Sequence, residues 1–421
     1  MPRRYFGTDG VRGVVGEDLT AELVERLGRA ATLWSGRGRI FIGRDTRASG
    51  VELEQALAQG ISSAGGNAVV AGVLPTPAVA LLTLDLGCVI TASHNPPEYN
   101  GVKFFDRDGQ KLTDEQEEQI EALLDQAGAG GGEIDEVGVA IDSYLEHVVE
   151  RFGSDLGALH IGVDCANGAY SGLAPRAFEQ LGAKVTPMGN DPDGTNINVG
   201  CGATDLRALQ ELVRSERLDL GVAFDGDGDR MLAVDAKGDV VDGDEIVAIL
   251  ALHLGVESVT VTPMTNVGFH ELMSKHGIET HTTDEVGDRY VLETMRATGG
   301  KLGGEQSGHI IYLDGHVTGD GLVAALLLCR SLAGRTLAEA AAEMPRYPQI
   351  KENVRVLSKI LSESLVQAVA AANEELSGRG RVLVRPSGTE PVIRVLAEAR
   401  DEEEAAHVCA SIAALVRREL G

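Results

Sequence analysis

Residues 220–234 read LGVAFDGDGDRMLAV and combine two apolar runs with a polar, glycine-rich turn. The apolar runs 220–224 and 231–234 predict two strands, and the turn predicts the loop between them. Side chains at positions i, i+2 and i+4 of extended backbone point the same way, so the carboxylates of Asp225, Asp227 and Asp229 are expected to converge. Unpaired carboxylates at close range repel one another, and an oxygen-preferring cation relieves that repulsion. We therefore expect these three aspartates to bind Mg²⁺.

Two other interpretations of this acidic loop compete with a magnesium site. A calcium loop of the EF-hand type needs glycine at its sixth position and glutamate at its twelfth, where this chain has Arg230 and Ala236. A solvated acidic turn is the simpler alternative, but it does not explain why three carboxylates follow a buried strand directly. The metal interpretation is therefore preferred.

The order of elements around this loop occurs three times along the chain. Each round has a strand, a helix, a strand, a helix and a third strand, followed by a polar loop and one more strand. The rounds cover 39–105, 159–234 and 258–313, and their polar loops are 91–96, 225–230 and 303–309. Alternating strands and helices form mostly parallel sheets, in which ligands bind beyond the carboxyl ends of the strands. We therefore expect three similar domains that turn corresponding edges toward one cleft.

From about Lys351 the order changes to strand, helix, strand, loop, strand and helix, which predicts a small α+β domain. The predicted fold class is α/β: three similar α/β/α domains with mixed, mostly parallel sheets plus a C-terminal α+β domain, with all four domains around one central cleft. The predicted boundaries are 1–152, 153–250, 251–348 and 349–421. Helix 206–215 of the second domain is expected to use Thr204 or Asp205 as its N-cap. The second helix of the first domain is expected over residues 78–84.

Ser93 lies in the first polar loop, Thr91-Ala92-Ser93-His94-Asn95-Pro96. A serine is a poor nucleophile unless a base or a metal assists it, and a turn with a capping hydroxyl is the simpler interpretation of this loop. The chain has no GxSxG motif, which argues against an acyl-transfer hydrolase. Ser93 becomes a candidate for catalysis only because the acidic loop occupies the corresponding place in the next domain.

The two remaining loops carry groups that suit a phosphorylated sugar. Guanidinium groups, hydroxyls and a glycine-containing turn suit a phosphate dianion, although the arginines of a hairpin can also pair with surface acids. In the third loop, carboxylate and hydroxyl groups can bind sugar hydroxyls, and a histidine can move a proton, although a lone histidine is more often structural. These candidates are Arg385, Ser387, Gly388, Thr389 and Arg394 in the fourth domain and Glu305, Ser307 and His309 in the third.

Composition narrows the class of protein. The chain has 421 residues, and its 64 acidic and 37 basic side chains give a formal charge of −27, which argues against a nucleic-acid partner. Five dispersed cysteines without a CxxC pair indicate reduced thiols in the cytoplasm. No signal-peptide pattern follows Met1, and the longest apolar runs, 246–256 and 322–329, are too short to span a bilayer and predict buried helices. We expect no membrane association.

Taken together, the four loops resemble those of the α-D-phosphohexomutase superfamily, in the same order and over the whole chain. Phe6-Gly7-Thr8-Asp9-Gly10-Val11-Arg12-Gly13 is similar to its N-terminal signature. The resemblance implies that Ser93 is phosphorylated and, with Asp225, Asp227 and Asp229, holds one Mg²⁺. It also implies that Lys103 and His309 are proton shuttles. The substrate-binding residues implied are Arg12, His94, Arg230, Glu305, Ser307, Arg385, Ser387, Gly388, Thr389 and Arg394.

Segments 304–309 and 286–291 are most similar to the superfamily members that act on glucosamine phosphates, whereas Glu285 is lysine in many phosphohexomutases. The resemblance implies a reversible conversion of glucosamine 6-phosphate to glucosamine 1-phosphate through a bisphosphosugar, which is both intermediate and activator, in UDP-N-acetylglucosamine synthesis. The alternatives are the same chemistry on mannose or glucose phosphates, a metal-dependent sugar phosphatase, and a non-enzymatic sugar-phosphate sensor. The expected partner is the phosphosugar, and a homodimer is a further hypothesis.

Overall fold

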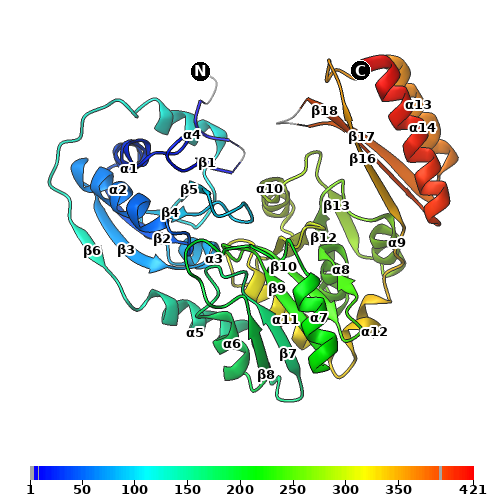
Figure 1. The fold of residues 1–421 in the computed structure, drawn as a ribbon, viewed down its shortest axis with the longest axis horizontal. Helices are drawn as coiled ribbons and strands as arrows, with labels where there is room; N and C mark the ends of the chain where they lie inside the picture. Colours follow the sequence, from blue (N-terminus) through cyan, green and yellow to red (C-terminus); the bar gives the residue numbers. More distant parts are fainter. Residues whose placement is uncertain (1–3, 8, 388–390) are drawn as a thin grey trace. The chain divides into compact units, whose positions relative to one another are not determined.

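The computed structural model describes residues 4–7, 9–387 and 391–421. The chain forms two compact units (Figure 1). The large unit comprises Met1–Pro263 and His281–Ala341, and the small unit comprises Met264–Thr280 and Ala342–Gly421. Within the described ranges, no helix is both long and apolar enough to cross a membrane.

The first sheet of the large unit has the order β1-β5-β4-β2-β3-β6. Strands β2, β3 and β4 are parallel, and β5 runs antiparallel to β4. Helices α1 and α2 pack against each other, and their apolar faces share one hydrophobic core with the sheet. The elements are β1 (Val11–Val14), α1 (Ala21–Ser35), β2 (Arg39–Arg44), α2 (Gly50–Ser63), β3 (Asn67–Val73), α3 (Thr76–Leu81), β4 (Leu86–Ile90), β5 (Tyr99–Phe105), α4 (Asp114–Glu121), β6 (Ile134–Glu136) and α5 (Ala140–Phe152).

The second and third sheets repeat this arrangement. Their orders are β11-β10-β9-β7-β8 and β13-β12-β14-β15. The elements of the second are β7 (His160–Asp164), α6 (Ala174–Gln180), β8 (Lys184–Met188), α7 (Arg207–Glu216), β9 (Leu220–Phe224), β10 (Met231–Asp235), β11 (Val240–Val241) and α8 (Gly243–Leu254). Those of the third are β12 (Ser258–Val261), α9 (Val267–Lys275), β13 (Glu279–Thr282), α10 (Asp288–Thr298), β14 (Leu302–Gly304), β15 (Ile310–Tyr312), α11 (Gly321–Leu332) and α12 (Leu337–Ala341).

The three sheets therefore share one core order, in which the fourth strand of a round lies beside the third, the third beside the first, and the first beside the second. These orders are β5-β4-β2-β3, β10-β9-β7-β8 and β15-β14-β12-β13. In each round the third strand is parallel to the first and antiparallel to the fourth. Each polar loop connects the third strand to the fourth, as the sequence predicts. The two longest apolar runs form α8 and α11, and both are buried helices, which confirms that prediction.

The C-terminal part is an antiparallel sheet of order β16-β18-β17 covered by two helices (Figure 1). Its elements are β16 (Gln349–Arg355), α13 (Glu363–Glu375), β17 (Gly380–Pro386), β18 (Val392–Ala399) and α14 (Glu402–Leu420). Apolar side chains of both helices and all three strands form one core. The predicted architecture of three α/β/α domains and one α+β domain is confirmed, whereas the domain boundaries and the central cleft stay predictions.

Two local predictions are wrong. The N-cap of helix α7 is Leu206, which makes no side-chain cap, and not Thr204 or Asp205. The Asp205 carboxylate lies one residue before the cap and pairs with the Arg207 side chain. The second helix of the first round is α3, which ends at Leu81 and not at 84, since the chain must turn to enter β4 at Leu86. Neither difference moves a polar loop.

Candidate active site

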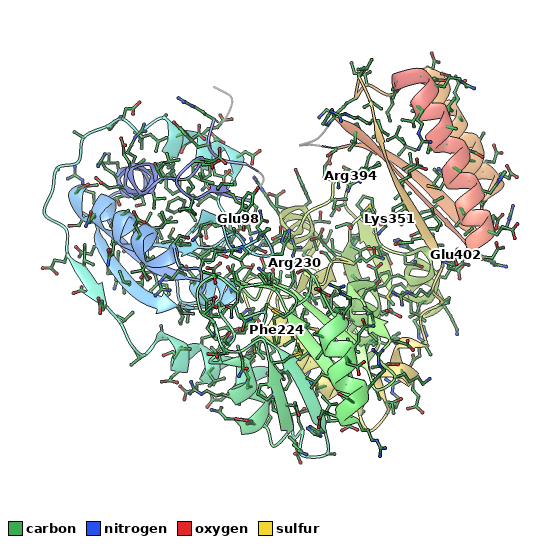
Figure 2. The ribbon with its side chains drawn as sticks, viewed as in Figure 1. Glu98, Phe224, Arg230, Lys351, Arg394 and Glu402 are labelled. Atoms are coloured by element: carbon green, nitrogen blue, oxygen red, sulfur yellow. The ribbon has the colours of Figure 1, made fainter. Side chains whose placement is uncertain are left out.

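The three polar loops of the large unit meet at one place. Ser93 Oγ in the first loop donates a hydrogen bond to Asp225 Oδ2 in the second, at 2.8 Å. The second and third loops are joined by the backbone, where Met231 N–H donates to Gly308 O at 2.9 Å. The acidic loop lies between Phe224, at the end of β9, and Arg230, both labelled in Figure 2. Equivalent strand ends of three domains therefore build one site.

Ser93 has an unusual backbone conformation. Its φ of 51° lies in the left-handed region, which residues other than glycine, asparagine and aspartate rarely adopt. The residue is only 2% exposed, and its Oγ lies 3.2 Å from His94 Nδ1 as well as close to Asp225. Backbone strain of this kind is concentrated at functional sites. The hydroxyl is thus held against the acidic loop.

The carboxylates of Asp225, Asp227 and Asp229 converge as expected. One oxygen from each lies within 4.8 Å of the others, and all three residues are buried. Among the described residues, Asp227 Oδ1 and Asp229 Oδ1 have no hydrogen-bond partner. Burial raises the pKa of the Asp225 carboxyl, and the Asp229 and Asp227 carboxylates raise it further. Orphaned, convergent carboxylate oxygens fit the hard, oxygen-coordinated cation that the sequence predicts.

Gly228 sets the path of the acidic loop. Its φ is 79°, and a Cβ at this position would lie 2.4 Å from a ring carbon of Tyr170. Its N–H donates to Asp225 Oδ1 at 3.1 Å, and the N–H of Arg230 donates to the same oxygen at 3.2 Å. The loop backbone therefore orients Asp225 directly.

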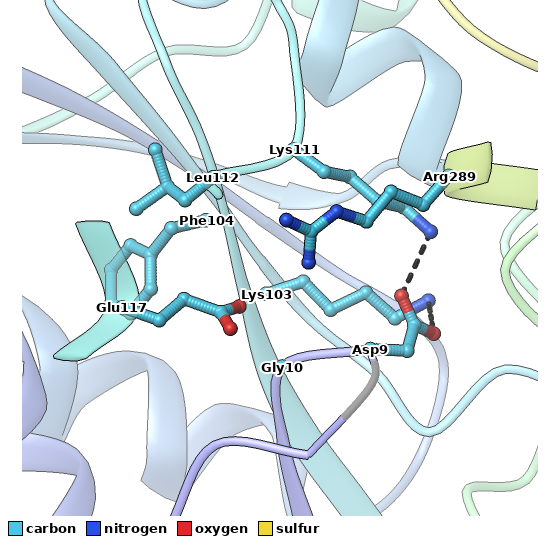
Figure 3. Close-up of a pocket in the computed structure, with 8 residues that line it drawn as sticks. All are labelled: Asp9, Gly10, Lys103, Phe104, Lys111, Leu112, Glu117 and Arg289. Atoms are coloured by element: carbon cyan, nitrogen blue, oxygen red, sulfur yellow. Dashed lines mark hydrogen bonds and ion pairs between the residues drawn. The ribbon is translucent and has the colours of Figure 1, made fainter. Parts of the chain in front are cut away.

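Lys103 lies beside the acidic loop at the edge of a small pocket (Figure 3). Its Nζ is 3.2 Å from Asp227 Oδ2 and 2.9 Å from Asp9 Oδ2, and the side chain is buried. Burial lowers the pKa of Lys103, but the Asp227, Asp9 and Asp229 carboxylates outweigh it and raise the pKa above its ordinary value. The side chain is therefore an ammonium group that faces the acidic loop.

His309 faces the same loop from the third domain. Its Nδ1 lies 3.7 Å from Asp229 Oδ1, and its Nε2 lies 3.4 Å from Asp288 Oδ2. Burial lowers the pKa of His309, but the carboxylates of Asp288 and Asp229 outweigh it and raise the pKa. Lys103 and His309 therefore both contact the acidic loop, from different domains.

Lys111 connects these two groups, and sequence reasoning missed it together with its partners. Its Nζ is 2.8 Å from Asp9 Oδ1 (Figure 3) and 2.6 Å from Asp288 Oδ2. Asp9 also pairs with Lys103 through Oδ2, and Asp288 Oδ2 also lies 3.4 Å from His309 Nε2. Asp9 and Asp288 carried a signal in the sequence, as parts of the N-terminal signature and of segment 286–291, whereas Lys111 carried none.

His94 lies in the serine loop, and the guanidinium groups of Arg12 and Arg230 are close enough to act on its ring. The Arg12 guanidinium donates to Asn95 Oδ1 at 3.2 Å and to Asp9 Oδ2 at 3.0 Å. Burial and the guanidinium groups of Arg230 and Arg12 lower the pKa of His94 to about 4, so the ring is neutral at neutral pH. The role of these three residues as substrate contacts stays a prediction.

Glu305 and Ser307 lie on the third loop, on either side of Gln306. Glu305 is 8% exposed, and burial raises its pKa, whereas Ser307 is exposed. The loop is closed by hydrogen bonds from Glu305 N–H to His309 O and from Gly308 N–H to Glu305 O, each 3.0 Å long.

The predicted phosphate loop belongs to the small unit. Arg385 and Arg394 are directly opposite each other on β17 and β18, and Arg394 Nη2 donates to Ser387 Oγ at 3.3 Å. Lys359, which the sequence did not indicate, adds a third cation, and its Nζ donates to Ser387 O at 2.8 Å. Gly388 and Thr389, as well as Thr8 of the N-terminal signature, lie outside the described residues.

Comparisons with known proteins agree with these loops. Four family models of phosphoglucomutase/phosphomannomutase match the chain: alpha/beta/alpha domains I, II and III at 3–129, 142–238 and 242–347, and the C-terminal domain at 339–415. The phosphoglucosamine mutase of Moorella thermoacetica is 50% identical over 97% of this chain and 98% of its own length. The phosphoglucosamine mutase of Bacillus subtilis is 44% identical over 99% of each chain. A crystal structure of a phosphoglucomutase/phosphomannomutase family protein from Burkholderia thailandensis superposes with a TM-score of 0.86 at 24% identity and covers 98% of this chain and 97% of its own.

Proposed function

Since the chain belongs to the phosphoglucosamine mutase family, we infer that it interconverts glucosamine 6-phosphate and glucosamine 1-phosphate, with Ser93 as the phosphate carrier. One observation supports the role of Ser93 above all others: its hydroxyl, in a strained backbone conformation, lies 2.8 Å from a buried carboxylate triplet. A serine beside a metal site suits reversible phosphoryl transfer better than acyl transfer. The product feeds UDP-N-acetylglucosamine synthesis.

The reaction consists of two phosphoryl transfers in opposite directions. In the first, the bond from Ser93 Oγ to phosphorus breaks, and a free hydroxyl of the sugar monophosphate bonds to the phosphorus and loses its proton. The resulting bisphosphosugar turns around. In the second, Ser93 Oγ accepts the other phosphoryl group, and the oxygen left on the sugar takes up a proton. The net result is an isomerised monophosphate and a rephosphorylated serine.

The residues of the large unit suit these steps. Asp225, Asp227 and Asp229 would hold Mg²⁺, which supplies positive charge where the transferring phosphoryl group becomes more negative. Lys103 and His309 are the proposed proton shuttles, because both contact the acidic loop that holds Ser93 Oγ. Arg12, His94, Arg230, Glu305 and Ser307 are proposed to bind the substrate.

The small unit is proposed to bind the phosphate that does not react. Arg385 and Arg394 carry guanidinium groups suited to a phosphate dianion. Ser387 supplies a hydroxyl beside Arg394, and its backbone carbonyl accepts a hydrogen bond from Lys359. Gly388 and Thr389 are proposed to contribute to the same loop. We further propose that the enzyme works in the cytoplasm, where its five unpaired, buried cysteines stay reduced.

The decisive experiment is a coupled mutase assay with a bisphosphosugar activator, run on wild type and Ser93→Ala together. We expect turnover of glucosamine 6-phosphate by wild type and a loss of about 10³-fold or more in Ser93→Ala. Glucose and mannose 6-phosphates are the comparison substrates, and a higher kcat/KM for either would overturn the substrate assignment. Release of inorganic phosphate without isomerised sugar would favour a phosphatase instead.

A further inference from the structure

A fully buried ion pair lies directly below the serine loop. Arg47 Nε donates to Asp45 Oδ2 at 2.9 Å, and both side chains are 0% exposed. The two residues follow β2 in the sequence Arg44-Asp45-Thr46-Arg47. Taking two charges out of water is unfavourable unless further hydrogen bonds satisfy them, so such a pair contributes little to stability by itself. The two residues also make hydrogen bonds to the serine loop.

Arg47 donates to four backbone carbonyl groups of one loop. Its Nη2 binds Ser93 O at 3.0 Å and Asn95 O at 2.8 Å, and its Nη1 binds Tyr99 O at 3.0 Å and also Pro96 O. These carbonyl groups span the loop that starts at Ser93 and ends where β5 begins. The planar guanidinium group therefore fixes the loop after the serine from inside the protein.

Asp45 fixes the same serine from the other side. Its Oδ2 accepts a hydrogen bond from Thr91 Oγ1 at 2.7 Å, and Thr91 Oγ1 accepts one from Ser93 N–H at 2.9 Å. The N–H and the C=O of Ser93 are thus both tied to one ion pair. Asn198 Nδ2 reinforces the carbonyl side at 2.9 Å.

We propose that Asp45 and Arg47 are positioning residues that hold Ser93 in its left-handed conformation and so aim its Oγ at Asp225. This inference rests on the proposed role of Ser93 as phosphate carrier. None of the hydrogen bonds involves Ser93 Oγ, so the same support is available to the serine and to the phosphoserine. The pair therefore keeps the acceptor and the donor of the phosphoryl group at one position throughout the cycle.

The test compares Arg47→Lys and Thr91→Val with Glu54→Gln. A lysine ammonium group cannot donate hydrogen bonds to four carbonyl groups as the planar guanidinium group does. Valine has nearly the size of threonine but lacks the hydroxyl that connects Ser93 N–H to the Asp45 carboxylate. Glu54 is the control because it forms the neighbouring, partly buried ion pair with Arg44, at 3.1 Å. Each variant is measured for its melting temperature, for kcat and KM in the mutase assay, and for phosphate on the purified protein by intact mass.

We expect kcat to fall by about 100-fold in Arg47→Lys and by about 10-fold in Thr91→Val, with KM within about 3-fold of wild type, because the reacting oxygen is misplaced while sugar contacts remain. Glu54→Gln should lower the melting temperature and leave kcat unchanged. If Arg47→Lys does not fold, Thr91→Val alone decides the question. A folded Thr91→Val with wild-type kcat, or an equal loss of kcat in Glu54→Gln, would overturn the proposal. Activity in Ser93→Ala would instead overturn the premise, and the two failures are therefore distinguishable.

Discussion

At the scale of single residues, the acidic loop shows an imbalance that a cation corrects. Asp227 Oδ1 and Asp229 Oδ1 are buried and, within the described part of the chain, accept no hydrogen bond. Lys103 and His309 offset part of the negative charge from one side, at 3.2 Å from Asp227 and 3.7 Å from Asp229. Asp225 accepts hydrogen bonds from Ser93 Oγ and from the backbone N–H groups of Gly228 and Arg230. These carboxylate oxygens are therefore the ones that we propose would hold a divalent ion.

Binding of Mg²⁺ should stabilise the folded protein measurably. At a concentration of about 100 times Kd, a ligand that binds only the folded state raises the free energy of unfolding by about 2.7 kcal/mol. We expect that increase for wild type in thermal denaturation with and without Mg²⁺, and little or none for Asp225→Asn. Asp125→Asn is the control, because its carboxylate is 92% exposed and pairs with Arg26 on the surface. An equal Mg²⁺ effect in Asp225→Asn would contradict the assignment of the site.

At the scale of elements, helix α9 makes the small unit sensitive to acid. His270 is partly buried on this helix, and burial together with the Arg381 guanidinium lowers its pKa to about 4. In the unfolded chain a histidine titrates near its ordinary value of about 6.5. Below that value the unfolded state binds a proton that the folded state rejects, so stability falls as the pH decreases from about 6.5 to about 4.

Replacing His270 should therefore reduce the loss of stability on acidification. Between about pH 7.5 and about pH 5.5, the histidine accounts for a loss of about 1 kcal/mol, which His270→Gln should not show. His407→Gln, on the exposed face of α14 in the same unit, should keep the wild-type response. The measurement is the melting temperature of the three proteins at both pH values. A decrease in His270→Gln as large as in wild type would show that this histidine does not titrate as described.

The elements also show which parts of the site a sequence can predict. A buried strand that runs into a glycine-rich polar loop is a local pattern, so Ser93, Asp225 and His309 can be placed at equivalent strand ends without a structure. Lys111 has no local pattern, because its partners Asp9 and Asp288 are 102 and 177 residues away in the chain. The proposed role of Arg47 could not be predicted for the same reason, because the carbonyl groups that it binds lie about 50 residues later in the chain. Every residue has a backbone carbonyl group, so such acceptors cannot be recognised from residue types. The wrong cap of α7 arose because Asp205 and Thr204 both suit an N-cap by type, whereas in the structure the Asp205 carboxylate pairs with the Arg207 side chain.

At the scale of the whole molecule, the net charge of the protein has the same negative sign as its proposed phosphorylated substrate. The chain carries a formal charge of −27, which repels a phosphorylated sugar at long range. In the large unit, the buried cations Lys103, Lys111 and Arg47 are all engaged by carboxylates. Arg385, Arg394 and Lys359 are three cations gathered around one loop of the small unit. Affinity for the substrate must therefore come from such local groups, and this cluster is proposed to supply it.

Arg394→Ala should accordingly weaken substrate binding in both directions of the reaction. Each monophosphate presents a phosphate that does not react, and a hydrogen bond to a charged group contributes about 1.5–3 kcal/mol, so KM should rise about 10- to 100-fold for glucosamine 6-phosphate and for glucosamine 1-phosphate. The phosphate on Ser93, measured by intact mass, should stay at the wild-type level, because Arg394 is not proposed to act on the serine. Arg417→Ala is the matched control: its side chain is 56% exposed on α14 of the same domain and pairs with Glu352. If KM rose for only one of the two monophosphates, Arg394 would bind a feature specific to that sugar, and the proposal of a common phosphate site would fail.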